Sequence, residues 1–146
     1  MPDLHDAAHR AHLVERLKAL KPEAQRQWGT MTPDQMLWHV SVPIALSLGE
    51  GTAVPDKIPI PRALLKFIVL NLPWGKNAPT NPGFVAKQNY DFNAEQARVL
   101  ILIEKVASKS LDAPWPDHPA FGPMTGRQVS KLHAKHLHHH LTQFGA

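Results

Sequence analysis

The sequence predicts an all-α protein built as a four-helix bundle, and two observations lead to this prediction. Four segments carry apolar residues at the three- and four-residue spacing of an amphipathic helix, and none shows convincing strand-like alternation. The 146 residues, 43% of them hydrophobic, are enough to form one domain with a core. We therefore expect a single helical domain over residues 1–146.

The first two predicted helices lie in the N-terminal third of the chain. Residues 4–20 carry apolar side chains at positions 4, 7, 8, 11, 14 and 17. The second helix is expected to follow Thr32, because Pro33 suits the first helical position and Gln35 completes a capping box. Gly49 marks its expected end.

Residues 49–92 differ from the rest of the chain. Six prolines lie between positions 55 and 82, around one short apolar stretch at 62–72. We expect a long irregular crossover with one short helix. Connections of this length are often lids or binding loops, and this one is long enough for the helices that it joins to run parallel.

The last two predicted helices complete the bundle. The third is expected to be capped by Asn93 and to end near residue 108. A proline-rich turn follows, after which Thr125 and Gln128 repeat the capping box and Gly145 marks the end of the last helix.

The amino-acid composition limits the kinds of functional site that the chain can form. The chain has no cysteine, which excludes disulfides, thiolate catalysis and cysteine-based zinc sites, but it has ten histidines. Imidazole suits zinc, nickel, copper and iron better than calcium or magnesium. No stretch approaches the roughly 20 apolar residues of a membrane-spanning helix, and the first residues do not resemble a signal peptide. We expect a cytoplasmic protein with no membrane partner.

The net charge of +4 is concentrated in one segment. Residues 51–90 contain five basic residues but only one acidic residue, Asp56. This segment could attract a small anionic substrate, or it could be an ordinary solvated surface. Aromatic residues do not alternate with the bases, so nucleic-acid binding is not expected. The five bases are Lys57, Arg62, Lys66, Lys76 and Lys87.

The strongest functional signal is a stripe on the last predicted helix. His136 and His140 continue an apolar face that begins at Val129 and ends at Gln143. Two residues four positions apart lie one above the other, with Cβ atoms about 5–6 Å apart. Both rings should therefore point inward, whereas His138 should point the opposite way.

The second predicted helix contains the same anomaly, because His39 lies between the core candidates Met36 and Val40. An unpaired buried polar group costs about 2–7 kcal/mol, so three inward imidazoles need partners. A shared divalent metal ion would satisfy one nitrogen of each ring. We predict His39, His136 and His140 as its ligands. The alternative is that these rings are hydrogen-bonded core residues.

The sequence signals that place other polar residues in the site are weaker. His139 and Gln143 lie next to the predicted ligands and could support them or contact a substrate. His5, His9 and His12 share one face of the first helix, but their polar neighbours indicate a solvated surface.

The segments QMLWH at 35–39 and HLHHHLTQ at 136–143 resemble motifs of the DinB/YfiT-like superfamily of metal-dependent proteins. More narrowly, residues 28–36, 118–122 and 135–144 resemble a DinB-related family of unknown function, although Val129 replaces an expected tryptophan. The resemblance implies an up-down-down-up four-helix bundle and a homodimer. It also implies nickel or zinc bound by three histidines, which here are His39, His136 and His140.

A metal site of this kind is compatible with a transferase or a hydrolase, but not with a typical zinc protease. Three protein ligands leave one coordination position open, as in catalytic zinc sites. Leu137 and His138 occupy the positions after His136 where a zinc protease would carry glutamate, which disfavours peptide hydrolysis. The sequence therefore suggests a metal-dependent transferase or hydrolase acting on a small molecule. A non-catalytic metal-binding module and a plain helical dimer remain the alternatives.

Overall fold

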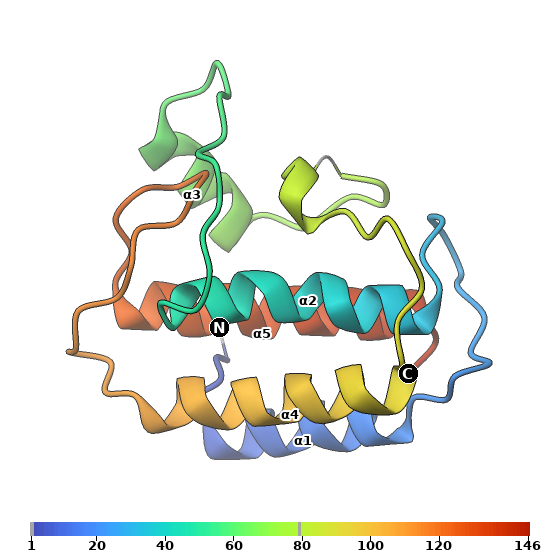
Figure 1. Cartoon of the computed structure of the whole chain (residues 1–146). Coiled ribbons are helices and arrows are strands. Elements are labelled where there is room, and N and C mark those ends of the chain that lie inside the picture. The colour runs from blue at the N-terminus through green and yellow to red at the C-terminus, as the bar shows by residue number, and fades with distance from the viewer. Residues whose placement is uncertain (1, 79) are drawn as a thin grey trace.

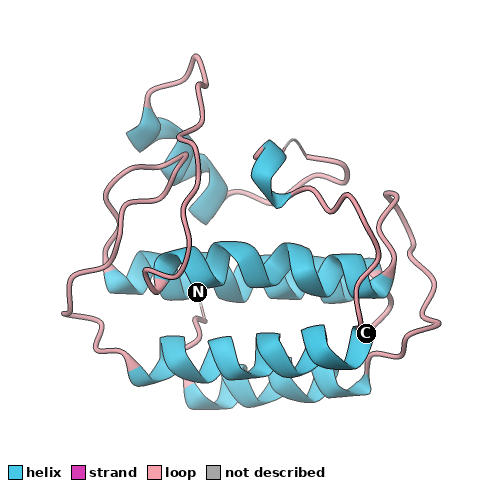
Figure 2. Cartoon of the chain, viewed as in Figure 1, coloured by secondary structure: helices cyan, strands magenta, loops and turns pink. Residues whose placement is uncertain are grey.

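The computed structural model describes residues 2–78 and 80–146, and within them it is all-helical, with no strand (Figure 2). The all-α prediction is confirmed with five α-helices, because the short helix expected in the crossover is present in addition to the four long ones. The elements are α1 (Ala7–Ala19), α2 (Pro33–Ser47), α3 (Arg62–Asn71), the 3₁₀ helix η1 (Pro82–Phe84), α4 (Phe92–Ser108) and α5 (Gly126–Gln143).

The four longer helices lie side by side, with α1 and α5 running in one direction and α2 and α4 in the other (Figure 1). Helix α2 packs most extensively against α4, and α5 contacts both α1 and α2. Because α2 and α4 are parallel neighbours, residues 48–91 must return from one end of the helices to the other. This crossover places α3 against α5 and η1 against α2.

The core lies between the four longer helices. Its side chains come from the apolar stripe of each helix, and burial of each large one contributes about 1.5–3 kcal/mol. Leu137 and Leu141 of α5 are each 1% exposed and face this core. The other core residues at its centre include Leu13, Leu17, Met36, Val40, Ile44, Val99 and Ile103.

Both predicted capping boxes are present. At the start of α2, Gln35 Oε1 accepts a hydrogen bond from the Thr32 backbone N–H at 3.0 Å. At the start of α5, the Thr125 side chain accepts from the Gln128 backbone N–H, and Gln128 Oε1 accepts from the Thr125 N–H. These boxes set where the two histidine-bearing helices begin.

The starts of the other two long helices differ from the prediction. Helix α4 is capped by Asp91, not Asn93, because the Asp91 carboxylate accepts from the Ala94 backbone N–H at 2.8 Å. Helix α1 begins at residue 7 and not at residue 4, because Asp6 accepts from the His9 N–H at 2.7 Å. No helix in the described ranges combines the length and apolarity needed to cross a bilayer.

The start of α5 depends on a residue without a side chain. A Cβ on Gly126 would lie 2.5 Å from Trp115 Nε1 and 2.8 Å from the Leu111 Cα. We expect Gly126→Ala to lower the free energy of unfolding by about 1–3 kcal/mol, because the backbone contact cannot relax cheaply. Urea denaturation would measure this. Gly75→Ala is the control, because no described residue other than its chain neighbours comes within 4 Å of its added Cβ; an equal loss in both variants would contradict the packing argument.

Candidate metal centre

The three predicted ligands converge between α2 and α5. His39 is 6% exposed, His140 is 9% exposed and His136 is half-buried. Their ring centroids lie 4.7–4.9 Å apart, and the ring planes cross at 71–82°. One nitrogen of each ring lies within 4.8 Å of the other two. These three rings therefore form a compact group that could hold a metal ion.

The outer nitrogen of His39 is held by the crossover. Its Nδ1 lies 2.7 Å from the Phe84 carbonyl oxygen, which can only accept, so Nδ1 carries the proton. Phe84 ends η1, and the Asn81 side chain caps that helix by accepting from the Gly83 N–H. Asn81 also donates to the Asp56 carboxylate at 2.7 Å. The crossover thus leaves His39 Nε2 as the nitrogen that bears the lone pair, and His136 Nε2 lies 3.0 Å from it as the hydrogen-bond partner.

The outer nitrogen of His140 is held by Gln143. The Gln143 amide donates through Nε2 to the Trp28 carbonyl at 2.8 Å, which turns its Oε1 towards His140 Nδ1 at 2.7 Å. His140 Nδ1 is therefore the donor, and Nε2 again keeps its lone pair. Gly29 makes room for this arrangement, since a Cβ there would lie 2.7 Å from Gln143 Nε2 and its φ is +77°.

Burial keeps the three rings neutral at pH 7. It lowers the pKa of His39, and it lowers the pKa of His140 to about 3. Burial, followed by the neighbouring His140 and His39, holds the pKa of His136 well below its usual value. Neutral imidazole is the form that binds a metal, so His39 and His140 can bind through Nε2 as they stand, and His136 can do so once its proton is on Nδ1.

The donor set fits a divalent ion that prefers imidazole. His136 Nε2 lies 3.0 Å from His39 Nε2, whereas two nitrogens bound at 2.0–2.1 Å in a tetrahedral site stand roughly 3.3 Å apart. This pair of nitrogens would have to separate by a few tenths of an ångström to bind one ion, and the His140 nitrogen lies within 4.8 Å of both. Two of the three rings also have the outer hydrogen-bond acceptor that metal-bound histidines almost always have.

The two other residues of the predicted site have different surroundings. Both ends of the Gln143 amide are occupied, by His140 and by the Trp28 carbonyl. His139 is half-buried, and its ring lies 5.5 Å from Trp28 and 5.4 Å from Trp74, measured between centroids. His139 thus lies beside the triad and contacts both indoles.

The prediction of a solvated histidine face on the first helix is wrong for His5. Its Nδ1 lies 2.8 Å from the Ser130 hydroxyl, and its Nε2 lies 2.8 Å from the Lys109 carbonyl oxygen. These bonds attach the N-terminal segment to the start of α5. His12 is exposed, as predicted. Within the described ranges, the group formed by His39, His136 and His140 is the one that could ligate a metal.

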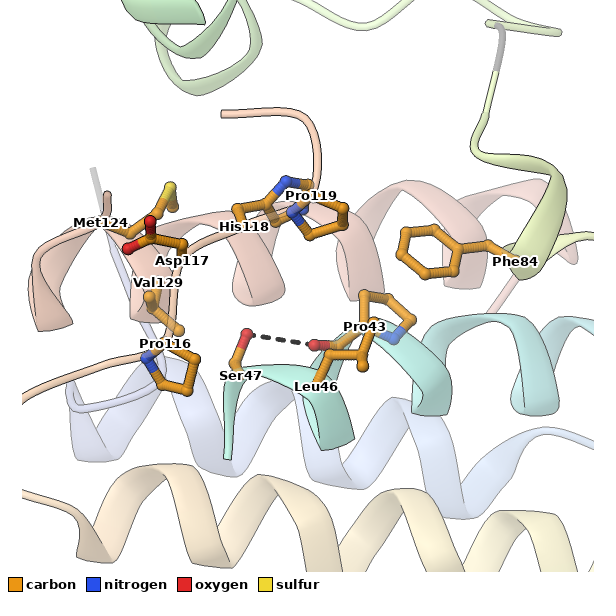
Figure 3. Close-up of a pocket in the computed structure, with 10 residues that line it drawn as sticks. All are labelled: Pro43, Leu46, Ser47, Phe84, Pro116, Asp117, His118, Pro119, Met124 and Val129. Carbon is orange, nitrogen blue, oxygen red and sulfur yellow. Dashed lines mark hydrogen bonds between the residues drawn. The ribbon is translucent and has the colours of Figure 1, made fainter. Parts of the chain in front are cut away.

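The sequence analysis missed His133, which is 1% exposed. Its Nε2 lies 2.7 Å from the Ser47 hydroxyl, which also donates to the Pro43 carbonyl at 3.0 Å (Figure 3). Its Nδ1 has no hydrogen-bond partner among the described residues. The signal was present, because residue 133 precedes residue 140 by seven positions, or two helical turns, on the same side of α5.

A small pocket lies next to this hydroxyl, between the end of α2, the start of α5 and residues 116–124 (Figure 3). Its volume of about 10 Å³ is near the minimum for one water molecule. Phe84 also lines it, so the same residue borders the pocket and holds His39. The pocket is too small for an organic substrate.

His133 makes stability depend on pH. Burial, and next the nearby His118, lowers its pKa to about 3 from an unfolded value of 6.5. Below pH 6.5 the unfolded chain binds a proton at this site that the folded chain does not, so stability falls as pH falls towards 3. His133→Leu should therefore stabilise the protein by about 2 kcal/mol more at pH 5 than at pH 7.5.

Urea denaturation at the two pH values measures this difference. His12→Gln is the control, because it replaces a histidine whose ring is exposed. An identical effect of His133→Leu at both pH values would show that His133 is not held neutral by burial.

The comparisons with known proteins identify a family and no activity. No curated protein and no solved structure gives a significant match to the chain. Residues 3–146 match the profile of a family described as "Protein of unknown function (DUF1569)". That description names no ligand or reaction, so the site must be interpreted from its own geometry. Because the match covers nearly the whole sequence, the chain belongs to the DUF1569 family.

Proposed function

We propose that this protein binds one divalent metal ion, nickel or zinc, through His39, His136 and His140, and uses it as a transferase or hydrolase acting on a small molecule. One observation carries the proposal. Three neutral imidazoles from two helices face one another, and the outer nitrogens of His39 and His140 are already hydrogen-bonded. Preorganised inner nitrogens of this kind are what a metal site requires.

The proposal includes membership of the DinB/YfiT-like superfamily, with α1, α2, α4 and α5 as its four-helix bundle. The directions of these helices in Figure 1 support the up-down-down-up order that the resemblance implies. The homodimer and the cytoplasmic location expected from the sequence are part of the same proposal. Size-exclusion chromatography with light scattering tests the dimer.

Three protein ligands favour a catalytic role. A divalent ion held in this way keeps a position for water or substrate, where it can polarise a carbonyl or lower the pKa of water. Gln143 positions the His140 ring and has no free polar atom pointing to a substrate. His139, beside the triad, is the side chain best placed to orient a substrate.

A non-catalytic metal is the second candidate, and one observation favours it. His39 belongs to α2, whereas His136 and His140 belong to α5, so one ion would cross-link two helices. An ion with that role would contribute to the stability of the fold directly.

Metal content tests the ligand set. Untagged protein should retain about one zinc or nickel ion per chain by mass spectrometry, whereas His39→Ala and His136→Ala should retain almost none. His138→Ala is the matched control, because this histidine of the same run is exposed on the opposite side and contacts Arg16. Equal metal loss from His138→Ala, or full retention by His39→Ala, would refute the triad.

Thermal melting separates the two candidate roles. If the ion is catalytic, His39→Ala should abolish metal binding while lowering the melting temperature by only a few degrees, because α2 and α5 still share an apolar core. A collapse of the melting temperature in His39→Ala and in chelated wild type alike would favour the structural role.

The contribution of Gln143 to metal affinity can be measured separately. Gln143→Leu removes the acceptor of the His140 N–H and the donor to the Trp28 carbonyl. We expect zinc affinity to fall about 10–100-fold, as for other residues that support metal-bound histidines. Competition with a chromogenic chelator measures the affinity. Gln25→Leu, at an exposed position, should bind zinc as wild type does; an unchanged affinity in Gln143→Leu would contradict this role.

A further inference from the structure

The triad is bordered on one side by an aromatic rim, which we define as Trp28, Trp74 and His139. The Trp74 ring lies 5.7 Å from His136, the half-buried member of the triad, and 5.4 Å from His139. The Trp28 ring lies 5.5 Å from His139, measured between centroids. Both indoles are half-buried, so each keeps some surface open to solvent next to the triad.

Loops from distant parts of the chain hold this rim in place. The Trp28 carbonyl accepts from Gln143. Trp74 donates through its indole N–H to the Val69 carbonyl at 2.8 Å, and Lys135 donates to the same carbonyl at 2.7 Å. Both tryptophans are therefore tied to α3 or α5 through polar contacts. Such restraint is typical of a binding surface formed before its ligand arrives.

The backbone near the rim adopts a conformation that most residues avoid. Asn77 has a φ of +60° and is the one non-glycine residue in the described ranges with a positive φ. Its Oδ1 lies 3.9 Å from the position of a Cβ on Gly29, so the loops that carry Trp28 and Trp74 approach each other here. Backbone conformations of this kind persist where the surroundings enforce them, and they cluster at ligand sites.

The charge around the rim is positive. Lys76 Nζ lies 5.2 Å from the Trp28 ring centroid, and Lys135 Nζ lies 5.3 Å from that of Trp74. Lys135 is bound to main-chain carbonyls, whereas the Lys76 side chain is exposed. The triad itself includes no carboxylate from the described residues. Three neutral imidazoles would leave the charge of a bound divalent ion uncompensated, which favours an anion beside it.

We propose that the aromatic rim and Lys76 select a small organic anion with a flat apolar body as the ligand of this site. Its anionic group lies at the triad, on the side of the rim where Lys76 adds positive charge, and its body packs against the indoles of Trp28 and Trp74. An inorganic anion would leave both indole surfaces unused, and a neutral aromatic molecule would leave the positive charge unused. This proposal rests on the proposed metal site.

A binding experiment with defined probes tests the selection. Protein loaded with cobalt(II) is titrated with benzoate, acetate, benzyl alcohol and benzylamine, and calorimetry measures each affinity. The visible absorption of cobalt reports whether the probe enters its coordination shell. We expect benzoate to bind at least tenfold more tightly than each of the other three and to change the cobalt spectrum.

Two matched variants locate the anion. Lys76→Gln should weaken benzoate binding about five- to tenfold and leave benzyl alcohol binding unchanged. Lys57→Gln removes another exposed base of the same segment and should leave benzoate binding as in wild type. Trp74→Leu should weaken benzoate binding and leave acetate binding unchanged. The cobalt content of this variant checks that the triad is still formed.

The outcomes separate this proposal from the one on which it rests. Cobalt-loaded protein that binds benzyl alcohol or acetate as tightly as benzoate would overturn the selection alone. An equal effect of Lys57→Gln and Lys76→Gln would also overturn it, because the charge effect would then belong to the whole segment. Failure of the wild-type chain to bind cobalt would overturn the proposed metal site and the selection together.

Discussion

The arrangement of the site depends on the hydrogen bonds that orient His39 and His140. Each ring donates its outer N–H to a fixed oxygen, from Phe84 in one case and Gln143 in the other. Those oxygens come from different parts of the chain, the crossover and the last turn of α5. Because a donated proton fixes the tautomer, both bonds direct a lone pair inward. The crossover and the loop before α2 are therefore as necessary to the site as the helices that carry the rings.

The interface between α2 and α5 is polar on one side and apolar on the other. Leu137 and Leu141 of α5 face the core shared by the four longer helices, whereas the triad lies on the side covered by the crossover. A second polar contact, between Ser47 and His133, joins the same two helices. Polar groups in such positions cost stability unless each finds a partner. This interface therefore gains its stability mainly from the apolar side, while the polar side determines which groups meet.

The triad histidines are neutral, and the nearby side chains are positively charged. Burial disfavours the second ring proton of each triad histidine, as the lowered pKa of His140 illustrates. The rings are therefore neutral at pH 7. The ammonium groups of Lys76 and Lys135 lie above the neighbouring indoles. A cation bound by neutral ligands next to such groups attracts anions more strongly than one bound by carboxylates. In the proposed metal site, the donor set would therefore affect ligand preference as well as the choice of metal.

The sequence alone predicted the helices and the three histidines that meet between α2 and α5, because helical periodicity, capping boxes and inward-facing histidines are local patterns that survive in the folded chain. The cap of α4 at Asp91 was missed because two neighbouring residues could each serve, and hydrogen-bond geometry decided between them. Only the tertiary structure revealed the Phe84 carbonyl as a partner of His39, the contacts of His139 with two indoles, the hydrogen bonds of His5 and the burial of His133. Those features join residues far apart in the chain, and a main-chain acceptor leaves no mark on the identity of its residue.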